Sequence, residues 1–186
     1  MAIVLGTIRE ALEGTSVDAI FLRGEAENIL ESDGAAEALL KIVKSERGDN
    51  RLRVIAQELL MMSGKVPIKK MVRVYCEAIP GAFMHQWWGL PGRHLGKFGE
   101  TVIKFGENAI PHLVDEMDNS DALTCLGPDA PIARKHEYCV GDLTAYMACL
   151  ILDYNYPDGK DREQRNGPRK ALQKEFNQLA ISEGWR

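Results

Sequence analysis

The chain has 186 residues, of which 45% are hydrophobic and 27% charged, and its formal net charge at pH 7 is −4. A domain of this length buries roughly 70% of the surface that its unfolded chain exposes, so neither a metal nor a disulfide is needed to stabilise it. The acidic balance disfavours nonspecific binding to nucleic acid and to an anionic membrane surface, because both depend on basic residues.

Apolar residues recur at intervals of three and four through most of the chain, which is the period of a helix face. Ser16 is expected to cap a helix that runs through Leu30, although Gly24 lies in its middle. A second helix follows Asp33-Gly34. Its apolar face is formed by Ala36, Leu39, Leu40 and Val43.

Cap and turn residues mark two clearer helices further along the chain. Asp49 or Asn50 is placed to cap the first, and Gly64 stands where a left-handed glycine would end it. Pro67 then falls in the first turn of the second, where a proline sacrifices no intrahelical hydrogen bond. Pro80-Gly81 is expected to stop this helix.

Four more helical segments are predicted in the second half of the chain. Residues 95–105 form one short helix, and Asn108 is expected to cap the next. A core helix covers Val140 to Tyr154. Residues 157–167 are interpreted as a polar linker, after which Pro168 opens the last helix.

No segment alternates between apolar and polar residues over the length of a strand, so no sheet is predicted. Short connections between most of the helices favour antiparallel neighbours. The connections over residues 79–93 and 119–138 are longer, and long loops often carry function. The predicted fold is all-α, with antiparallel helix pairs stacked as a short α-solenoid or helical bundle in a single domain over residues 1–186.

Residues 99–118 contain two short predicted helices that meet at a glycine turn, the second with the pattern Ala-Ile-Pro-x-Leu-Val. This stretch resembles one HEAT-type repeat, in which helix pairs bury their apolar stripes by stacking on one another. A longer pattern, from Trp88-Gly89-Leu90-Pro91-Gly92 to residues 138–146, resembles a group of bacterial HEAT-like proteins. The resemblance implies helix pairing, clearest over residues 66–155, and it carries no activity and no site residue.

Residues 89–99 are rich in glycine but lack the spacing of a phosphate-binding loop, since Pro91 and Phe98 occupy positions that such a loop needs for Gly and for Ser or Thr. A turn before the next helix is the preferred interpretation. The histidines show no metal-ligand spacing, and neither a metal nor a cofactor is expected. They are His85, His94, His112 and His136.

The four cysteines show no CxxC spacing, and buried free thiols are the preferred interpretation. They are Cys76, Cys125, Cys139 and Cys149. A catalytic cysteine is the alternative, because His136, Cys139 and Asp142 lie close together in the sequence.

Residues 83–91 place five large apolar side chains between two predicted helices. They either plug the interface between helix pairs or form an exposed aromatic patch that anchors a partner, since Trp is frequent at binding hot spots. One Trp inside and one outside would satisfy both interpretations. The candidate partner-binding residues are His85, Trp87, Trp88, Arg93 and His94.

We therefore expect a non-catalytic protein–protein interaction module, such as an adaptor or an immunity-type inhibitor, with another protein as its partner. The first alternative is an enzyme whose site is assembled from separate helices around residues 83–94. The second alternative is a nucleic-acid-binding protein, for which the local basic cluster is diluted by Asp158, Asp161 and Glu163. That cluster comprises Arg162, Arg165, Arg169 and Lys170.

No apolar run approaches the ~18 residues of a membrane span. The first residues also lack the basic region of a signal peptide. These features favour a cytoplasmic protein that does not bind membranes, with a secretion signal removed beforehand as the alternative.

Overall fold

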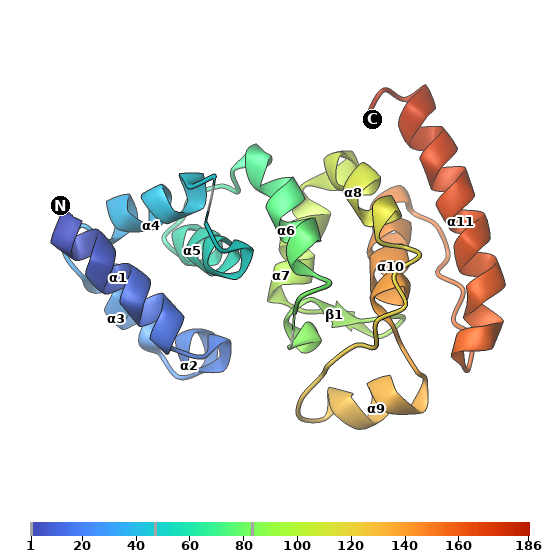
Figure 1. Ribbon diagram of the computed structural model, residues 1–186, viewed down its shortest axis with the longest axis horizontal. Helices are drawn as coiled ribbons and strands as arrows, with labels where there is room; N and C mark the ends of the chain where they lie inside the picture. Colours follow the sequence, from blue (N-terminus) through green and yellow to red (C-terminus); the bar gives the residue numbers. More distant parts are fainter. Residues whose placement is uncertain (1, 47, 83) are drawn as a thin grey trace. The chain divides into compact units, whose positions relative to one another are not determined.

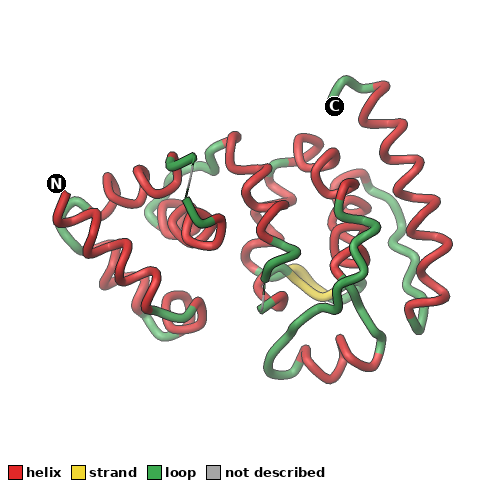
Figure 2. The backbone as a smooth tube through the Cα atoms, viewed as in Figure 1, coloured by secondary structure: helices red, strands yellow, loops and turns green. Residues whose placement is uncertain are grey.

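The structure is a computed structural model that describes residues 2–46, 48–82 and 84–186, with side chains from residue 6 onwards. Helices dominate the described residues, and the strands found there form one two-stranded ribbon (Figures 1 and 2). The all-α prediction is confirmed. Among the described residues, no helix is both long enough and apolar enough to cross a bilayer.

The internal contacts of the chain group into two compact units, Met1–Val74 and Tyr75–Arg186. The boundary falls within helix α6 (Val72–Ala78). The prediction of one domain over residues 1–186 and of solenoid stacking stays a prediction, and the two units are described separately.

The first unit is a small cluster of helices. In chain order these are α1 (Ala2–Gly14), α2 (Val17–Leu22), α3 (Glu25–Glu31), α4 (Ala35–Lys44), α5 (Asn50–Met62) and the 3-10 turn η1 (Lys69–Met71). Helices α4 and α5 pack most closely, and α1 contacts both. Fully buried side chains fill the space between them, including Leu12, Leu39, Ile55 and Leu59.

Local cap chemistry explains where several of these helices begin and end. Asp49 rather than Asn50 caps α5, because its carboxylate accepts the N–H of Arg51 at 2.7 Å. The helix predicted from Ser16 to Leu30 is wrong as a single element. Gly24 adopts a left-handed φ of 84° that separates α2 from α3.

The second unit is built around α10 (Val140–Leu152), which contacts α7 (Lys97–Lys104), the 3-10 turn η3 (Gly106–Ala109), α8 (Ile110–Asp115) and α11 (Arg162–Ser182). Most residues of α10 are buried, as expected for a helix with neighbours on several sides. Helix α9 (Asp129–Lys135) lies at the end of the unit beyond the ribbon (Figure 1). Helices α7 and α8 both pack on α10.

A short antiparallel ribbon corrects the prediction that the chain has no strands. Strand β1 (Gly89–Leu90) pairs with β2 (His94–Leu95), Gly89 opposite Leu95 and Leu90 opposite His94. Strands of two residues are too short to show alternation in the sequence. The ribbon follows the 3-10 turn η2 (His85–Trp87) and leads into α7.

Three predicted helix boundaries, one in the first unit and two in the second, are also wrong. Pro67 precedes the helical region rather than opening it, since Ile68 is extended and η1 comes before α6. Asn108 lies inside η3 and donates to the carbonyl of Phe105 at 3.2 Å, so it is not an N-cap. Helix α11 begins before Pro168, at Arg162, because Asp161 caps it by accepting the N–H of Gln164 at 2.9 Å.

Candidate functional site

His85, the first candidate in the Trp-rich loop, is buried and holds two loops together. Its Nδ1 accepts the backbone N–H of Thr124 at 2.9 Å, so the proton of the neutral ring lies on Nε2, which donates to the carbonyl of Ile79 at 3.0 Å. Burial lowers the pKa of His85 and favours this neutral form. Both ring nitrogens are therefore used inside the fold, and neither is open to a substrate or a metal.

Both tryptophans of the loop contact the ring of Phe98. Trp88 is only 3% exposed and makes edge contacts with Tyr75 and Phe98, at centroid distances of 5.9 and 5.3 Å. Trp87 is half-buried and stacks on Phe98 at 5.7 Å. Trp88 is therefore part of the core, whereas Trp87 keeps part of its ring at the surface.

Arg93 and His94 are exposed on the ribbon, where His94 Nε2 lies 3.3 Å from a carboxylate oxygen of Asp129. His85 instead faces Ile79 and Thr124, so the structure does not bring the loop's two histidines to a common partner. A partner that binds this loop would contact Trp87, Arg93 and His94.

The cysteines lack the features of a nucleophile. Burial raises the pKa of Cys76 and Cys149 to about 12 and that of Cys125 to about 11. Burial and the nearby Asp142 also raise the pKa of Cys139. A reactive thiol requires the opposite shift, so the interpretation as buried free thiols fits the structure. Within the described ranges, no group of three or more potential ligands could hold a metal ion.

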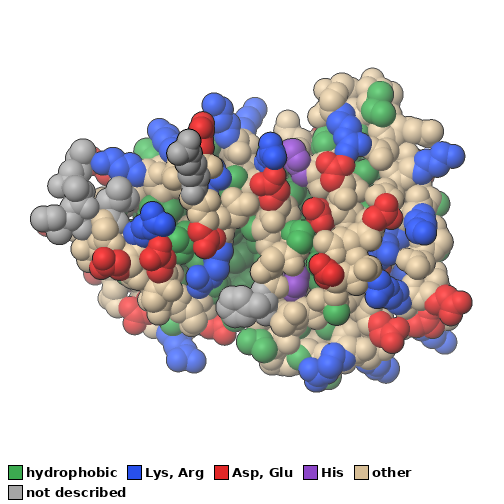
Figure 3. All heavy atoms as spheres, viewed as in Figure 1, with side chains coloured by type: hydrophobic (Ala, Val, Ile, Leu, Met, Phe, Trp, Pro, Cys, Tyr) green, Lys and Arg blue, Asp and Glu red, His purple; other side chains and the backbone are tan. Residues whose placement is uncertain are grey.

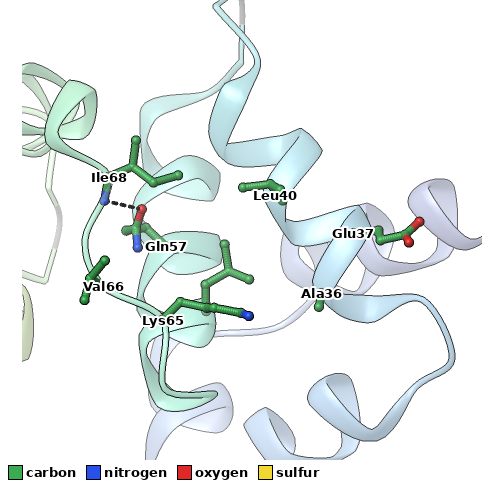
Figure 4. A pocket seen from close by; sticks show the side chains of 8 residues that line it. Ala36, Glu37, Leu40, Gln57, Lys65, Val66 and Ile68 are labelled. Carbon is green, nitrogen blue, oxygen red and sulfur yellow. Dashed lines mark hydrogen bonds between the residues drawn. The ribbon is translucent and has the colours of Figure 1, made fainter.

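The first unit contains a more promising feature, an apolar hollow of about 410 Å³ that we call the α4–α5 groove (Figure 4). It is lined by Ala36, Glu37, Leu40, Gln57, Leu60, Lys65, Val66 and Ile68. Leu40 is 36% exposed and Val66 80% exposed, although both are large apolar side chains. This volume lies in the range of small ligand-binding pockets, which are also mainly apolar with a few polar groups.

One wall of the groove is an extended segment, residues 65–68. Gly64 adopts a left-handed φ of 83° after α5, and Pro67 favours extended backbone at Val66 before it. The N–H of Ile68 donates to Oε1 of Gln57 at 3.3 Å, which ties the segment to α5 (Figure 4). The groove is therefore held open by local backbone chemistry and one side-chain hydrogen bond.

Gln57 supplies the groove's unusual polar feature. Its side chain is fully buried, and because Oε1 accepts from Ile68, the amide nitrogen is fixed as Nε2. This Nε2 has no hydrogen-bond partner among the described residues. An unsatisfied buried donor costs about 1–3 kcal/mol, so a carbonyl placed beside it would be stabilised.

Comparisons of the chain with protein-family models, with curated proteins and with solved structures found no match. The likeness to HEAT-like proteins consequently stays a prediction.

The sequence points to the Trp-rich loop and does not reveal the groove. The helical period predicts that Ala36 and Leu40 of α4 face the core together with Leu39 and Val43. In the structure Leu39 and Val43 are buried, whereas Ala36 and Leu40 are exposed. The sequence signal for the groove is Val66, a large apolar residue that lies between Gly64 and Pro67 and outside any apolar helical stripe.

Proposed function

We propose that the chain is a protein-binding module whose α4–α5 groove takes an extended apolar segment of a partner. The proposal rests on one observation: within an apolar groove, the Nε2 of Gln57 has no hydrogen-bond partner in the part of the chain that the structure describes. Binding of an apolar segment would release water from the side chains of Leu40 and Val66, which favours the complex. The buried N–H donor of Gln57 would in addition be satisfied by an acceptor from the ligand. A peptide supplies both kinds of group.

The donor favours an extended segment over a helix. Carbonyl groups inside a helix already accept backbone hydrogen bonds, whereas every second carbonyl of an extended strand is free to accept from a neighbour. Gln57 Nε2 would donate to one such carbonyl, and the flanking apolar side chains would lie against Leu40, Leu60 and Val66. Glu37 and Lys65 line the same groove with opposite charges, so they add orientation without favouring a strongly charged partner.

A selection from displayed random peptides tests the proposal across many partner sequences at once. Peptides are selected on the wild-type chain and counter-selected on Leu40→Lys, which puts a charge into the groove. We expect enriched peptides with adjacent apolar residues, and an affinity that falls about tenfold or more in Leu40→Lys and Val66→Lys.

Leu22→Lys is the matched control, because Leu22 is an exposed leucine in the same unit that does not line the groove. It should leave the affinity of the selected peptides unchanged. The proposal would be refuted if the selection yielded no enriched peptides. It would also be refuted if Leu22→Lys weakened the binding of the selected peptides as much as Leu40→Lys and Val66→Lys do.

A further inference from the structure

Arg165 and Arg169, two of the four clustered basic residues of α11, are buried in a polar network with the start of α10. Asp142 is fully buried, and its two oxygens accept from Arg165 Nη2 and Arg169 Nη1, each at 3.0 Å. Asp142 also accepts the N–H of Cys139 at 3.1 Å, which fixes its orientation at the N-terminus of α10. Two of the four clustered basic residues therefore face inward instead of forming a surface stripe.

The two arginines differ in how well their charges are satisfied. Arg165 also donates to the carbonyls of Gly159, His136 and Glu137, and its guanidinium lies 4.5 Å from the ring centre of Tyr138. Arg169 has fewer partners. Besides Asp142 it donates to Cys139 Sγ at 2.7 Å and to the side-chain oxygen of Asn166 at 2.8 Å.

The network contains more positive than negative charge. Two guanidinium groups share the single carboxylate of Asp142, and the Nε atoms of Arg165 and Arg169 are buried without a hydrogen-bond partner among the described residues. A buried charge without a counter-charge is costly, so an anion close to the network would stabilise it.

A hollow of about 540 Å³ lies beside Arg169 at the surface of the second unit. Its lining residues are Asp118, Ser120, Arg162, Asn166, Arg169, Lys170 and Gln173. The lining thus contains three cationic side chains and one carboxylate, although the formal net charge of the whole chain is −4. On the face drawn in Figure 3, acidic and basic side chains are interspersed across the second unit.

We propose that this hollow binds a small oxyanion of the phosphate type, such as the phosphate group of a small molecule. Arg162 and Lys170 would donate charged hydrogen bonds, Asn166 and Ser120 offer neutral donors, and the buried Arg169 adds positive charge behind them. This site lies in the second unit, and its existence does not depend on the α4–α5 groove.

Titration with inorganic phosphate tests the site by calorimetry and by amide chemical shifts, at constant ionic strength maintained with sodium chloride. We expect saturable binding of one phosphate, with the largest shifts at the side-chain amides of Asn166 and Gln173. The double variant Arg162→Gln, Lys170→Gln should weaken binding about tenfold or more, while both replacements leave the Asp142 network intact.

Lys174→Gln is the matched control, because Lys174 is an exposed lysine of the same helix that does not line the hollow. Its affinity for phosphate should stay within about twofold of the wild type, since a distant exposed charge is screened by salt. Thermal denaturation of each variant verifies that it is folded. Absence of saturation, shifts centred elsewhere, or an equal loss in Lys174→Gln would overturn the proposal.

Discussion

Replacing Asp142 by Asn should destabilise the second unit more than any exposed carboxylate replacement. The change preserves the size of the side chain but removes its charge. Arg165 and Arg169 would then remain buried beside a neutral amide, whose NH2 group would also point a donor at one of the guanidinium groups.

The magnitude follows from what each arginine retains. Arg165 keeps three carbonyl acceptors. Among the described residues Arg169 keeps only the side-chain oxygen of Asn166 and the Cys139 thiol, so its charge is left almost uncompensated. Breaking a buried ion pair from one side costs about 3–5 kcal/mol. For a unit of this size that free energy corresponds to a fall in Tm of roughly 10–20 °C.

Urea denaturation followed by circular dichroism measures the loss, read as a lower midpoint with an unchanged slope. Asp158→Asn is the control. Asp158 is exposed and accepts one hydrogen bond, from the hydroxyl of Tyr138 at 3.3 Å, so its replacement should cost less than about 1 kcal/mol. If Asp142→Asn cost no more than Asp158→Asn, the network would not have the energetic role assigned to it.

Three further predictions concern glycine packing, pH and thiol reactivity. Gly99→Ala should cost about 3 kcal/mol or more in unfolding experiments, because the added Cβ would lie 1.9 Å from the carbonyl oxygen of Trp88, whereas Gly81→Ala, with open space around it, should be nearly neutral. Burial lowers the pKa of His85, so the unfolded state binds a proton at this residue more readily than the folded state does. The free energy of unfolding should therefore fall as the pH drops below about 6.5, by up to about 1.4 kcal/mol per pH unit. His85→Gln should remove this contribution to the pH dependence. Cys76 and Cys149 should react with a thiol reagent at pH 8 only as fast as the protein unfolds, and rapid labelling of the native protein would contradict their burial.

Helix content is predictable wherever apolar residues mark the buried face. Leu39 and Val43 on α4, and the Asp49 cap of α5, follow directly from period and cap chemistry. The start of α11 does not, because its first turns bury Arg165 and Arg169 instead of apolar side chains. Because this face of α11 is buried through ion pairs of two arginines with Asp142, its sequence shows no hydrophobic period.

The short elements escape prediction for a different reason. Residues 129–135 form α9 although Pro, Asp and Gly around them are typical of loops. The interpretation of the glycine-rich stretch as a turn agrees with the ribbon, but its physical cause appears only in three dimensions. Gly96 and Gly99 lie so close to the backbone of residues 86–88 that any side chain would collide with it.

Neither the α4–α5 groove nor the hollow beside Arg169 can be predicted from the sequence, because residues in each depart from the burial that their sequence pattern predicts. Periodicity assigns Leu40 to the core, yet Leu40 is 36% exposed and lines a groove with Lys65, Val66 and Ile68. Composition makes the arginines of α11 look like a solvated surface, yet two of them are buried around Asp142. Burial and unsatisfied hydrogen bonds among the described residues, rather than residue types, indicate both candidate sites.

We propose that an extended peptide segment binds in the α4–α5 groove and accepts a hydrogen bond from Gln57. Amide and methyl spectra of the chain, recorded while a selected peptide is added, test it directly. We predict that the side-chain NH2 signals of Gln57 shift strongly and become protected from exchange, together with shifts of the Leu40 and Val66 methyl groups. Shifts that instead centre on Trp87 and His94, with the Gln57 signals unmoved, would show that the peptide binds outside the α4–α5 groove.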